Sequence, residues 1–212
     1  MLKITDDFVR EFLFGESTGH DYQHIDRVRK TALKIGKEEN ADLFIVEMSS
    51  LLHDIADRKH HKEDEEAGLK IVNQWLERIG VEVAEHDHIV EIIETLSFKG
   101  ASVRTDMRTI EGKVVQDADR LDAIGAIGIA RTFAYGGAKG RQMYDPAIKP
   151  EKHEDYEHYK TSRGTTINHF YEKLLLLKDR MNTKTAKKIA QERHRFMEGY
   201  LKQFYREWSG ED

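Results

Sequence analysis

The 212-residue chain contains no cysteine and only two prolines. The lack of cysteine excludes disulfides, thiolate catalysis and cysteine-based zinc fingers. No apolar run approaches the roughly 20 residues that a membrane-spanning helix needs, so we expect no membrane association. The N-terminal sequence is charged from its start and lacks the apolar core of a secretory signal peptide. We therefore expect a cytoplasmic protein.

The chain also lacks an excess of basic residues, with 34 Lys and Arg against 39 Asp and Glu. A net charge of −5 argues against stable binding of nucleic acid, although it leaves room for a local basic pocket that holds a small polyanion. The length is sufficient for one sizeable hydrophobic core. We expect a single domain over 1–212, in which a core of about 18–135 precedes a loop of about 136–160 and C-terminal helices of about 163–208. The sequence does not indicate the oligomeric state.

No segment alternates like a β-strand, and apolar residues instead recur at helical spacing. The pattern predicts an all-α bundle with helices over 5–14, 21–38, 42–56, 64–79, 82–97, 109–133, 163–181 and 184–208. Gly80 is expected to end the fourth of these helices, and Thr183 to cap the last. Gly125 and Gly128 fall inside the predicted helix 109–133. They favour close approach by another helix over a phosphate loop, because no strand precedes them.

Both prolines lie in the segment from Gly136 to about residue 160, which has little apolar periodicity. Loops of this length in compact domains are commonly lids or binding segments. The segment directly follows the helix predicted to carry Asp119, so a lid near that residue and a surface excursion both remain open.

Two histidines and two carboxylates, spread over three predicted helices, have the composition of a divalent-metal site. His24 stands in GHDYQHIDRV, His53 and Asp54 in SLLHDIADRK, and Asp119 in VVQDADRLDA. Neutral imidazole with carboxylate suits Mn, Fe, Co, Ni or Zn better than Ca or Mg. Four such ligands leave room on a metal for water, whose pKa the metal lowers toward ~7. A His-Asp dipeptide alone is often a structural pair, so the combination of segments carries the prediction.

In that order the motifs resemble those of the HD-domain phosphohydrolases, whose signature is H…HD…D, and most closely those of small bacterial YpgQ-like members. The flanking residues also match: HxxRV around the first ligand, an Asp three residues after the HD pair, and ADRL around the last. The resemblance extends from about residue 18 to the C-terminal helix. It implies a metal-dependent hydrolase with one metal, for which manganese is our first choice.

Asp57 lies three residues beyond Asp54, about one helical turn on. In related HD hydrolases an acidic residue at this offset handles a proton, and we expect the same role here. The alternative is a salt bridge with Arg58 or Lys62. Alarmone hydrolases carry a Glu-Asp pair after the HD motif, whereas this chain has Asp57-Arg58, which weakens that assignment.

Several basic or polar side chains near these motifs are candidates for contacts with a phosphorylated substrate. They are His20, Arg27, Lys59, Lys99, His169 and Lys173. His86 and His88 are two residues apart and so diverge on one helix, which argues against a second metal held by both. His20 is also a candidate for a capping role.

We therefore expect hydrolysis of a phosphoester or phosphoanhydride. The resemblance implies a nucleotide substrate, including the cleavage of nucleoside triphosphate to monophosphate and pyrophosphate. Two alternatives remain open. One is a phosphohydrolase of alarmones or nucleoside monophosphates, and the other is a regulatory module that binds metal and nucleotide without turnover.

Overall fold

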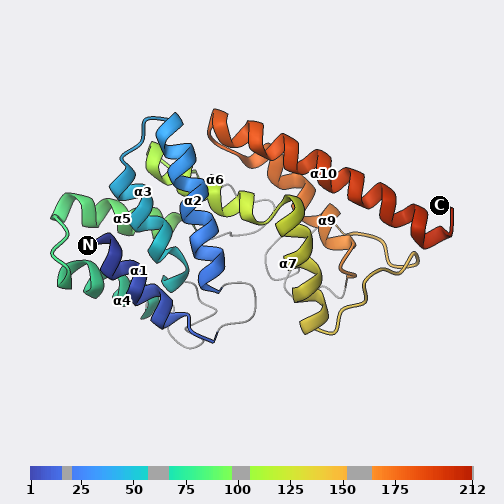
Figure 1. Cartoon of the computed structure of the whole chain (residues 1–212), viewed down its shortest axis with the longest axis horizontal. Coiled ribbons are helices and arrows are strands. Elements are labelled where there is room, and N and C mark those ends of the chain that lie inside the picture. Colours follow the sequence, from blue (N-terminus) through green and yellow to red (C-terminus); the bar gives the residue numbers. More distant parts are fainter. Residues whose placement is uncertain (16–20, 57–66, 97–105, 152–163, 212) are drawn as a thin grey trace. The chain divides into compact units, whose positions relative to one another are not determined.

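The computed structural model describes residues 1–15, 21–56, 67–96, 106–151 and 164–211, in which every regular element is a helix (Figure 1). The all-α prediction is therefore confirmed. The chain falls into two compact units, and the boundary lies inside one helix, between Ala118 and Asp119. That the whole chain acts as one domain stays a prediction. The described part contains no helix that is both long and apolar enough to cross a membrane.

The first unit contains the helices that precede this boundary. They are α1 (Leu2–Phe12), α2 (Tyr22–Glu38), α3 (Leu43–Leu52), the short 3₁₀ helix η1 (His53–Ala56), α4 (Ala67–Arg78), α5 (Val83–Leu96) and most of α6 (Ile110–Asp122). The second unit contains the last turn of α6 and the elements that follow it. They are α7 (Gly125–Ala138), α9 (Asn168–Glu172), the 3₁₀ helix η3 (Leu174–Arg180) and α10 (Lys184–Ser209).

Helix α3 is the centre of the first unit, in contact with α1, α2, α5 and η1. Its sequence, LFIVEMSSLL, is apolar around most of its circumference, which is the pattern of a helix buried on all sides. Helix α2 lies beside it and buries one stripe, which includes His24, Val28 and Ala32. The Arg29 guanidinium on α2 pairs with Glu47 on α3 at 2.6 Å. The helix that bears His24 and the helix that directly precedes His53 are thus packed and also bridged.

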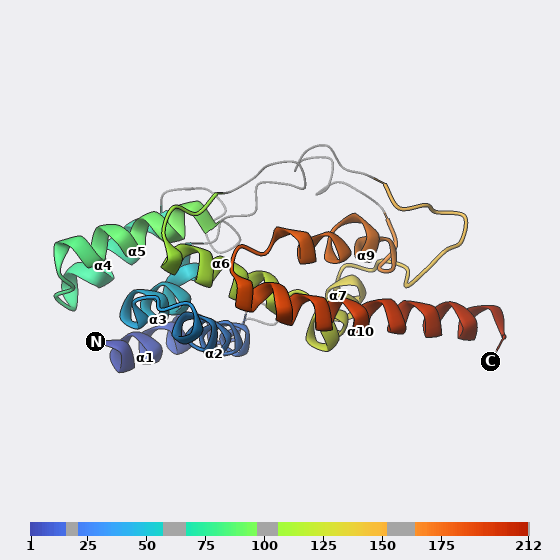
Figure 2. The same ribbon diagram turned by 90° about the horizontal axis from the view of Figure 1, so that it is seen from above.

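Helices α1 and α4 close the outside of this unit. The rings of Phe8 and Trp75 stack at 4.0 Å between centroids, and the Trp75 indole donates a hydrogen bond to the Thr5 hydroxyl at 3.0 Å. Gly80 follows α4 with φ +73°, a left-handed conformation that glycine adopts without strain. Its predicted role as the glycine that ends this helix is confirmed. Helices α4 and α5 pack against each other after that turn (Figure 2).

In the second unit, α10 packs against α7 and η3. An aromatic cluster fills the space within this unit, where Phe170 stacks on Tyr200 at 6.0 Å and both approach Phe133. Thr183 caps α10 as predicted, because its hydroxyl accepts a hydrogen bond from the Ala186 amide at 3.2 Å. The long C-terminal helix thus begins and packs as the sequence indicates.

The prediction of one helix over 109–133 is wrong, because the chain breaks between α6 and α7. Ile124 is extended and Gly125 has φ +78°, so the helix cannot continue through them. A Cβ on Gly128 would lie 2.2 Å from the Ala123 carbonyl oxygen. The close approach expected at Gly128 is therefore to the backbone of the α6–α7 turn, whereas Gly125 contacts the Arg193 side chain of α10.

Three other boundaries also differ. Helix α3 ends at Leu52 and the chain tightens into η1, whereas the predicted helix 42–56 was continuous. The predicted helix 163–181 is divided at Lys173, whose φ of −141° is not helical. Helix α7 extends to Ala138, so the long loop begins later than Gly136, and its part 152–163 lies outside the described residues.

Asp42 offers a test of how α3 begins, because its carboxylate accepts hydrogen bonds from the Phe44 and Ile45 amides. Asp42→Ala should lower the free energy of unfolding by ~1 kcal/mol, the usual cost of losing such a cap. Asp42→Asn, which retains an acceptor of the same shape, should lose much less. Urea denaturation followed by circular dichroism would measure both. Equal losses in the two variants would mean that the cap does not stabilise α3.

Candidate metal centre

His53 is the first residue of η1, directly after α3 ends at Leu52. Its Nδ1 lies 2.8 Å from the Ser50 carbonyl oxygen. A carbonyl can only accept, so the ring donates through Nδ1, and the neutral imidazole then has its lone pair on Nε2. Histidines that bind metals are commonly oriented in this way by a backbone carbonyl. The end of α3 therefore fixes both the tautomer and the direction of this ring.

Asp54 places its carboxylate between two imidazoles. Its Oδ2 lies 3.5 Å from Nε2 of His24, and its Oδ1 lies 3.5 Å from Nε2 of His53. Asp54 is 5% exposed, His24 1% and His53 6%, so water screens this group very little. His53 and Asp54 are adjacent, so their side chains diverge by roughly 100° or more on a helix, yet the Asp54 carboxylate reaches both imidazoles.

Asp119, half-buried in the last turn of α6, completes the predicted set of ligands. His24, His53 and Asp119 each offer a ligand atom, and these atoms all lie within 4.8 Å of one another. An ion with bonds of roughly 2.0–2.2 Å separates its ligand atoms by roughly 3 Å at right angles and by at most about 4.4 Å across the ion. The 3.5 Å separations at Asp54 lie in that range, and the donor set of imidazole and carboxylate suits a transition metal.

Local interactions hold the helix that carries His24. Asp21 caps α2, and its carboxylate accepts a hydrogen bond from the His24 backbone amide at 3.0 Å. The cap places His24 in the first turn, where its side chain points into the core beside α3. The sequence led us to consider a cap at His20 and not at Asp21, so this capping role of Asp21 was missed. An Asp immediately before an apolar helical stripe is the signal that could have identified it.

Of the predicted proton-transfer and substrate residues, only some can be located. His20, Asp57, Lys59 and Lys99 lie outside the described residues. Arg27 is half-buried on α2, three residues after His24 and so on nearly the same face of that helix.

His169 and Lys173 lie at α9 in the second unit, and the structure adds Arg141 to them. Burial, together with the charges of Lys173 and Arg141, lowers the pKa of His169 to about 3. At neutral pH His169 is therefore an uncharged hydrogen-bonding group, and the positive charge at this place comes from Lys173 and Arg141. The guanidinium of Arg141 also lies 5.9 Å from the ring centre of Tyr135. Sequence spacing could not suggest Arg141, because 28 residues separate it from His169.

Two further histidines have structural partners. Nε2 of His86 lies 2.8 Å from the Asn73 side-chain oxygen, and Nε2 of His88 lies 2.9 Å from the Thr109 hydroxyl. These contacts join α5 to neighbouring segments of the first unit. They give both residues a structural role.

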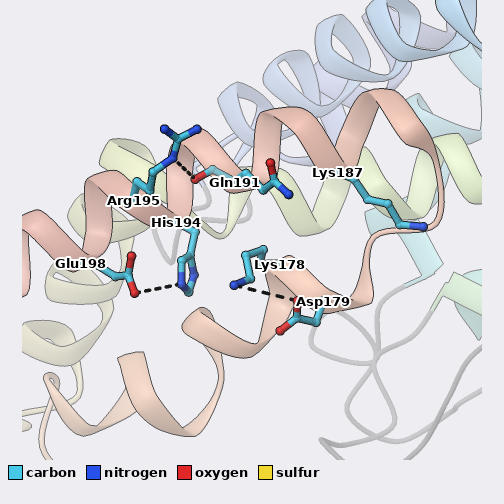
Figure 3. A pocket seen from close by; sticks show the side chains of 7 residues that line it. All are labelled: Lys178, Asp179, Lys187, Gln191, His194, Arg195 and Glu198. Carbon is cyan, nitrogen blue, oxygen red and sulfur yellow. Dashed lines mark hydrogen bonds and ion pairs between the residues drawn. The ribbon is translucent and has the colours of Figure 1, made fainter.

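An open groove of about 530 Å³ lies between η3 and α10 in the second unit (Figure 3). Its lining is Lys178, Asp179, Lys187, Gln191, His194, Arg195 and Glu198. Positive and negative side chains are mixed there, and Nε2 of His194 pairs with Glu198 at 3.3 Å. None of the predicted metal ligands or substrate contacts lines this groove, so its lining gives no reason to assign it to the same chemistry.

Comparison with known proteins identifies the family. Residues 21–124 match the HD domain, a span that contains His24, His53, Asp54 and Asp119. The chain belongs to the HD-domain family, and it is a metal-dependent phosphohydrolase of that family. The resemblance drawn from the sequence motifs is therefore confirmed.

The relatives are similar over nearly their whole length. YpgQ of Bacillus subtilis is 41% identical over 97% of this chain and 92% of its own length. A crystal structure of an HD-superfamily hydrolase from Bacillus thuringiensis shares 50% identity with a TM-score of 0.79, covering 98% of this chain and 96% of that one. The crystal structure of B. subtilis YpgQ in complex with ADP has a TM-score of 0.75 and covers 98% and 100%. The similarity thus includes both compact units.

The His169 environment can be tested by titration. The unfolded chain should bind a proton at this residue near pH 6.5, whereas the folded protein should not do so until about pH 3. The stability that neutral His169 provides is therefore fully present above about pH 6.5 and is lost as the pH falls toward 3. NMR should show its imidazole still uncharged at pH 4.5. A titration midpoint near pH 6.5 would contradict this burial.

Proposed function

We propose that the protein hydrolyses a phosphoester or phosphoanhydride bond of a nucleotide, with one divalent metal held by His24, His53, Asp54 and Asp119. The observation that carries the proposal is the buried carboxylate of Asp54 between two imidazole nitrogens, each 3.5 Å away. A buried carboxylate needs compensating charge or hydrogen bonds, and a divalent cation supplies the charge. Manganese is the first choice among the metals that this donor set accepts.

Each ligand has a separate structural reason to face the metal. The Ser50 carbonyl orients His53, the Asp21 cap and the packing of α2 on α3 orient His24, and the last turn of α6 presents Asp119. When bound, the metal supplies Lewis-acid activation of water and charge neutralisation at a phosphate oxygen. The low exposure of His24, His53 and Asp54 keeps bulk water away from the group.

The remaining tasks fall to other side chains of the same motifs. We assign the transfer of a proton to Asp57, because it follows Asp54 by three residues in the motif HDIAD. Arg27 is the first candidate for a phosphate contact, since it shares a face of α2 with His24. Lys59 and Lys99 are further cationic candidates, and His20 a polar one. Lys173 adds charge at α9, where neutral His169 adds a hydrogen-bonding group.

A nucleotide is the substrate class that the family and its members support best. The ADP complex of the 41% identical YpgQ is a precedent for such a ligand in a close relative. We propose nucleoside triphosphates, cleaved to monophosphate and pyrophosphate, as the first substrates to examine. The cytoplasmic location also stays a prediction.

Metal binding tests the ligand assignment directly. Protein stripped with a chelator and titrated with Mn²⁺ in a calorimeter should bind about one ion per chain, because the four ligands form one site. Asp54→Ala should bind Mn²⁺ at least tenfold more weakly. Asp26→Ala is the matched control, since Asp26 lies on α2 and pairs with Lys30 at the surface at 2.6 Å. Undiminished binding in Asp54→Ala, or loss to the same extent in Asp26→Ala, would refute the assignment.

Turnover of a nucleotide panel with Mn²⁺ tests the reaction. We expect hydrolysis of at least one nucleotide, with ³¹P NMR separating pyrophosphate from phosphate as the product. Asp57→Asn should retain the metal but lower kcat by ~10²–10⁴, because the amide cannot exchange the proton. A change in kcat below about threefold would mean that Asp57 is a structural charge. Binding of metal and nucleotide without any turnover would instead favour the regulatory module.

A further inference from the structure

The last turn of α6, Asp119–Asp122, is held by side chains from the helices that follow it in the second unit. A helix leaves its final carbonyl groups without partners inside the helix. Here the Leu121 carbonyl accepts a hydrogen bond from the Ile124 amide, which follows the helix, and the Arg193 guanidinium, from α10, donates a second hydrogen bond to it. Positive charge at the C-terminal end of a helix is also favoured by the helix dipole. Arg193 therefore acts as a cap that comes from far along the chain.

A second arginine binds the same turn. Nη1 of Arg131, on α7, lies 2.6 Å from the Asp122 carboxylate. The Arg120 side chain, from within the turn, reaches back to the Arg180 carbonyl at the end of η3. The turn is thus connected to α7, η3 and α10 by three separate interactions, and its rotation about the α6 axis is restricted by all of them.

The backbone at the α6–α7 break is shaped to admit Arg193. A Cβ on Gly125 would lie 2.9 Å from the Arg193 Cγ, so the hydrocarbon part of the arginine rests directly on this glycine. The positive φ of Gly125 then turns the chain away into α7. Figure 1 shows this bend next to α10. The side chain of Arg193 is partly buried by this packing, which lowers the pKa of its guanidinium, while Asp122 acts in the opposite direction.

We infer that Arg193 is a positioning residue for the metal ligand Asp119. Asp119 begins the turn whose end Arg193 caps, only two residues before the capped Leu121 carbonyl. A shift or fraying of this turn would move the Asp119 carboxylate, and metal affinity falls steeply when a ligand is no longer held in place. The C-terminal helix, which contributes no predicted ligand, would thereby control how tightly the metal is bound. This inference rests on the proposed function, because Asp119 is a proposed ligand.

The test compares two arginines of α10, Arg193 and Arg195. Arg193→Met retains the hydrocarbon stem that packs on Gly125 and removes only the guanidinium. Arg195→Met is the matched control, because Arg195 is exposed and its Nε donates to the Gln191 carbonyl of its own helix, at 3.4 Å. Removing a partner that orients a metal ligand typically weakens binding 10–100-fold. We therefore expect Arg193→Met to bind Mn²⁺ at least ~10-fold more weakly than wild type, and Arg195→Met to bind it normally.

Hydrogen exchange separates positioning from a general loss of stability. In the metal-free protein, Arg193→Met should raise amide exchange in the last turn of α6 and leave the amides of α2 protected, with unchanged helical circular dichroism. Arg193→Lys, which restores a cationic donor, should recover part of the metal affinity. Wild-type Mn²⁺ affinity in Arg193→Met, or exchange that rises equally in α2, would overturn the role of Arg193. A wild-type protein that binds no metal would instead overturn the ligand assignment itself.

Discussion

The buried carboxylate of Asp54, placed between two imidazoles, is the constraint on which the arrangement of the first unit depends. An ionised carboxylate with so little exposure is costly unless charge or hydrogen bonds compensate it. His24 approaches it from α2, and His53 from η1 directly after α3, so α2 and α3 must hold a fixed register. The apolar surface of α3 and the pairing of Arg29 with Glu47 provide that register. The hydrophobic core of this unit therefore holds Asp54 and its two imidazoles in place, although the burial of such a polar group is by itself unfavourable.

Where α3 ends and η1 begins, two adjacent residues reach one site, although successive side chains of a helix diverge by roughly 100° or more. The Asp54 carboxylate and Nε2 of His53 nevertheless lie 3.5 Å apart. The 3₁₀ turn begins at His53, and the Ser50 carbonyl at the end of α3 accepts the Nδ1 proton of its ring. The backbone carbonyl of Ser50, at the end of α3, thus orients the ring of His53.

The sequence was sufficient to predict those elements that depend on residues close together in the chain. The apolar spacing located nearly every helix, and the short motifs around His24, His53 and Asp119 identified the family, because ligands and their flanking residues recur at fixed offsets. The break before Gly125 was missed, since two glycines within an apolar stripe fit a continuous helix as well as a turn. The side chain that packs on Gly125 at this turn is that of Arg193, which is 68 residues away in the sequence. Arg141 beside His169 was missed for the same reason, because its proximity depends on tertiary structure.

The two kinds of positive charge in the protein have different roles, and burial distinguishes them. Arg193 and Arg131 are partly buried and engage backbone carbonyl and carboxylate oxygens at the end of α6, which commits them to structure. At α9, burial keeps His169 neutral, so a phosphate held there would meet the charge of Lys173 and Arg141 while His169 offers only hydrogen bonds. A neutral imidazole near these two cations avoids adding a third like charge, whose desolvation and repulsion would destabilise the unit. Desolvation, the cost of burying a charged group, therefore explains why His169 can lie near Lys173 and Arg141 without contributing a charge of its own.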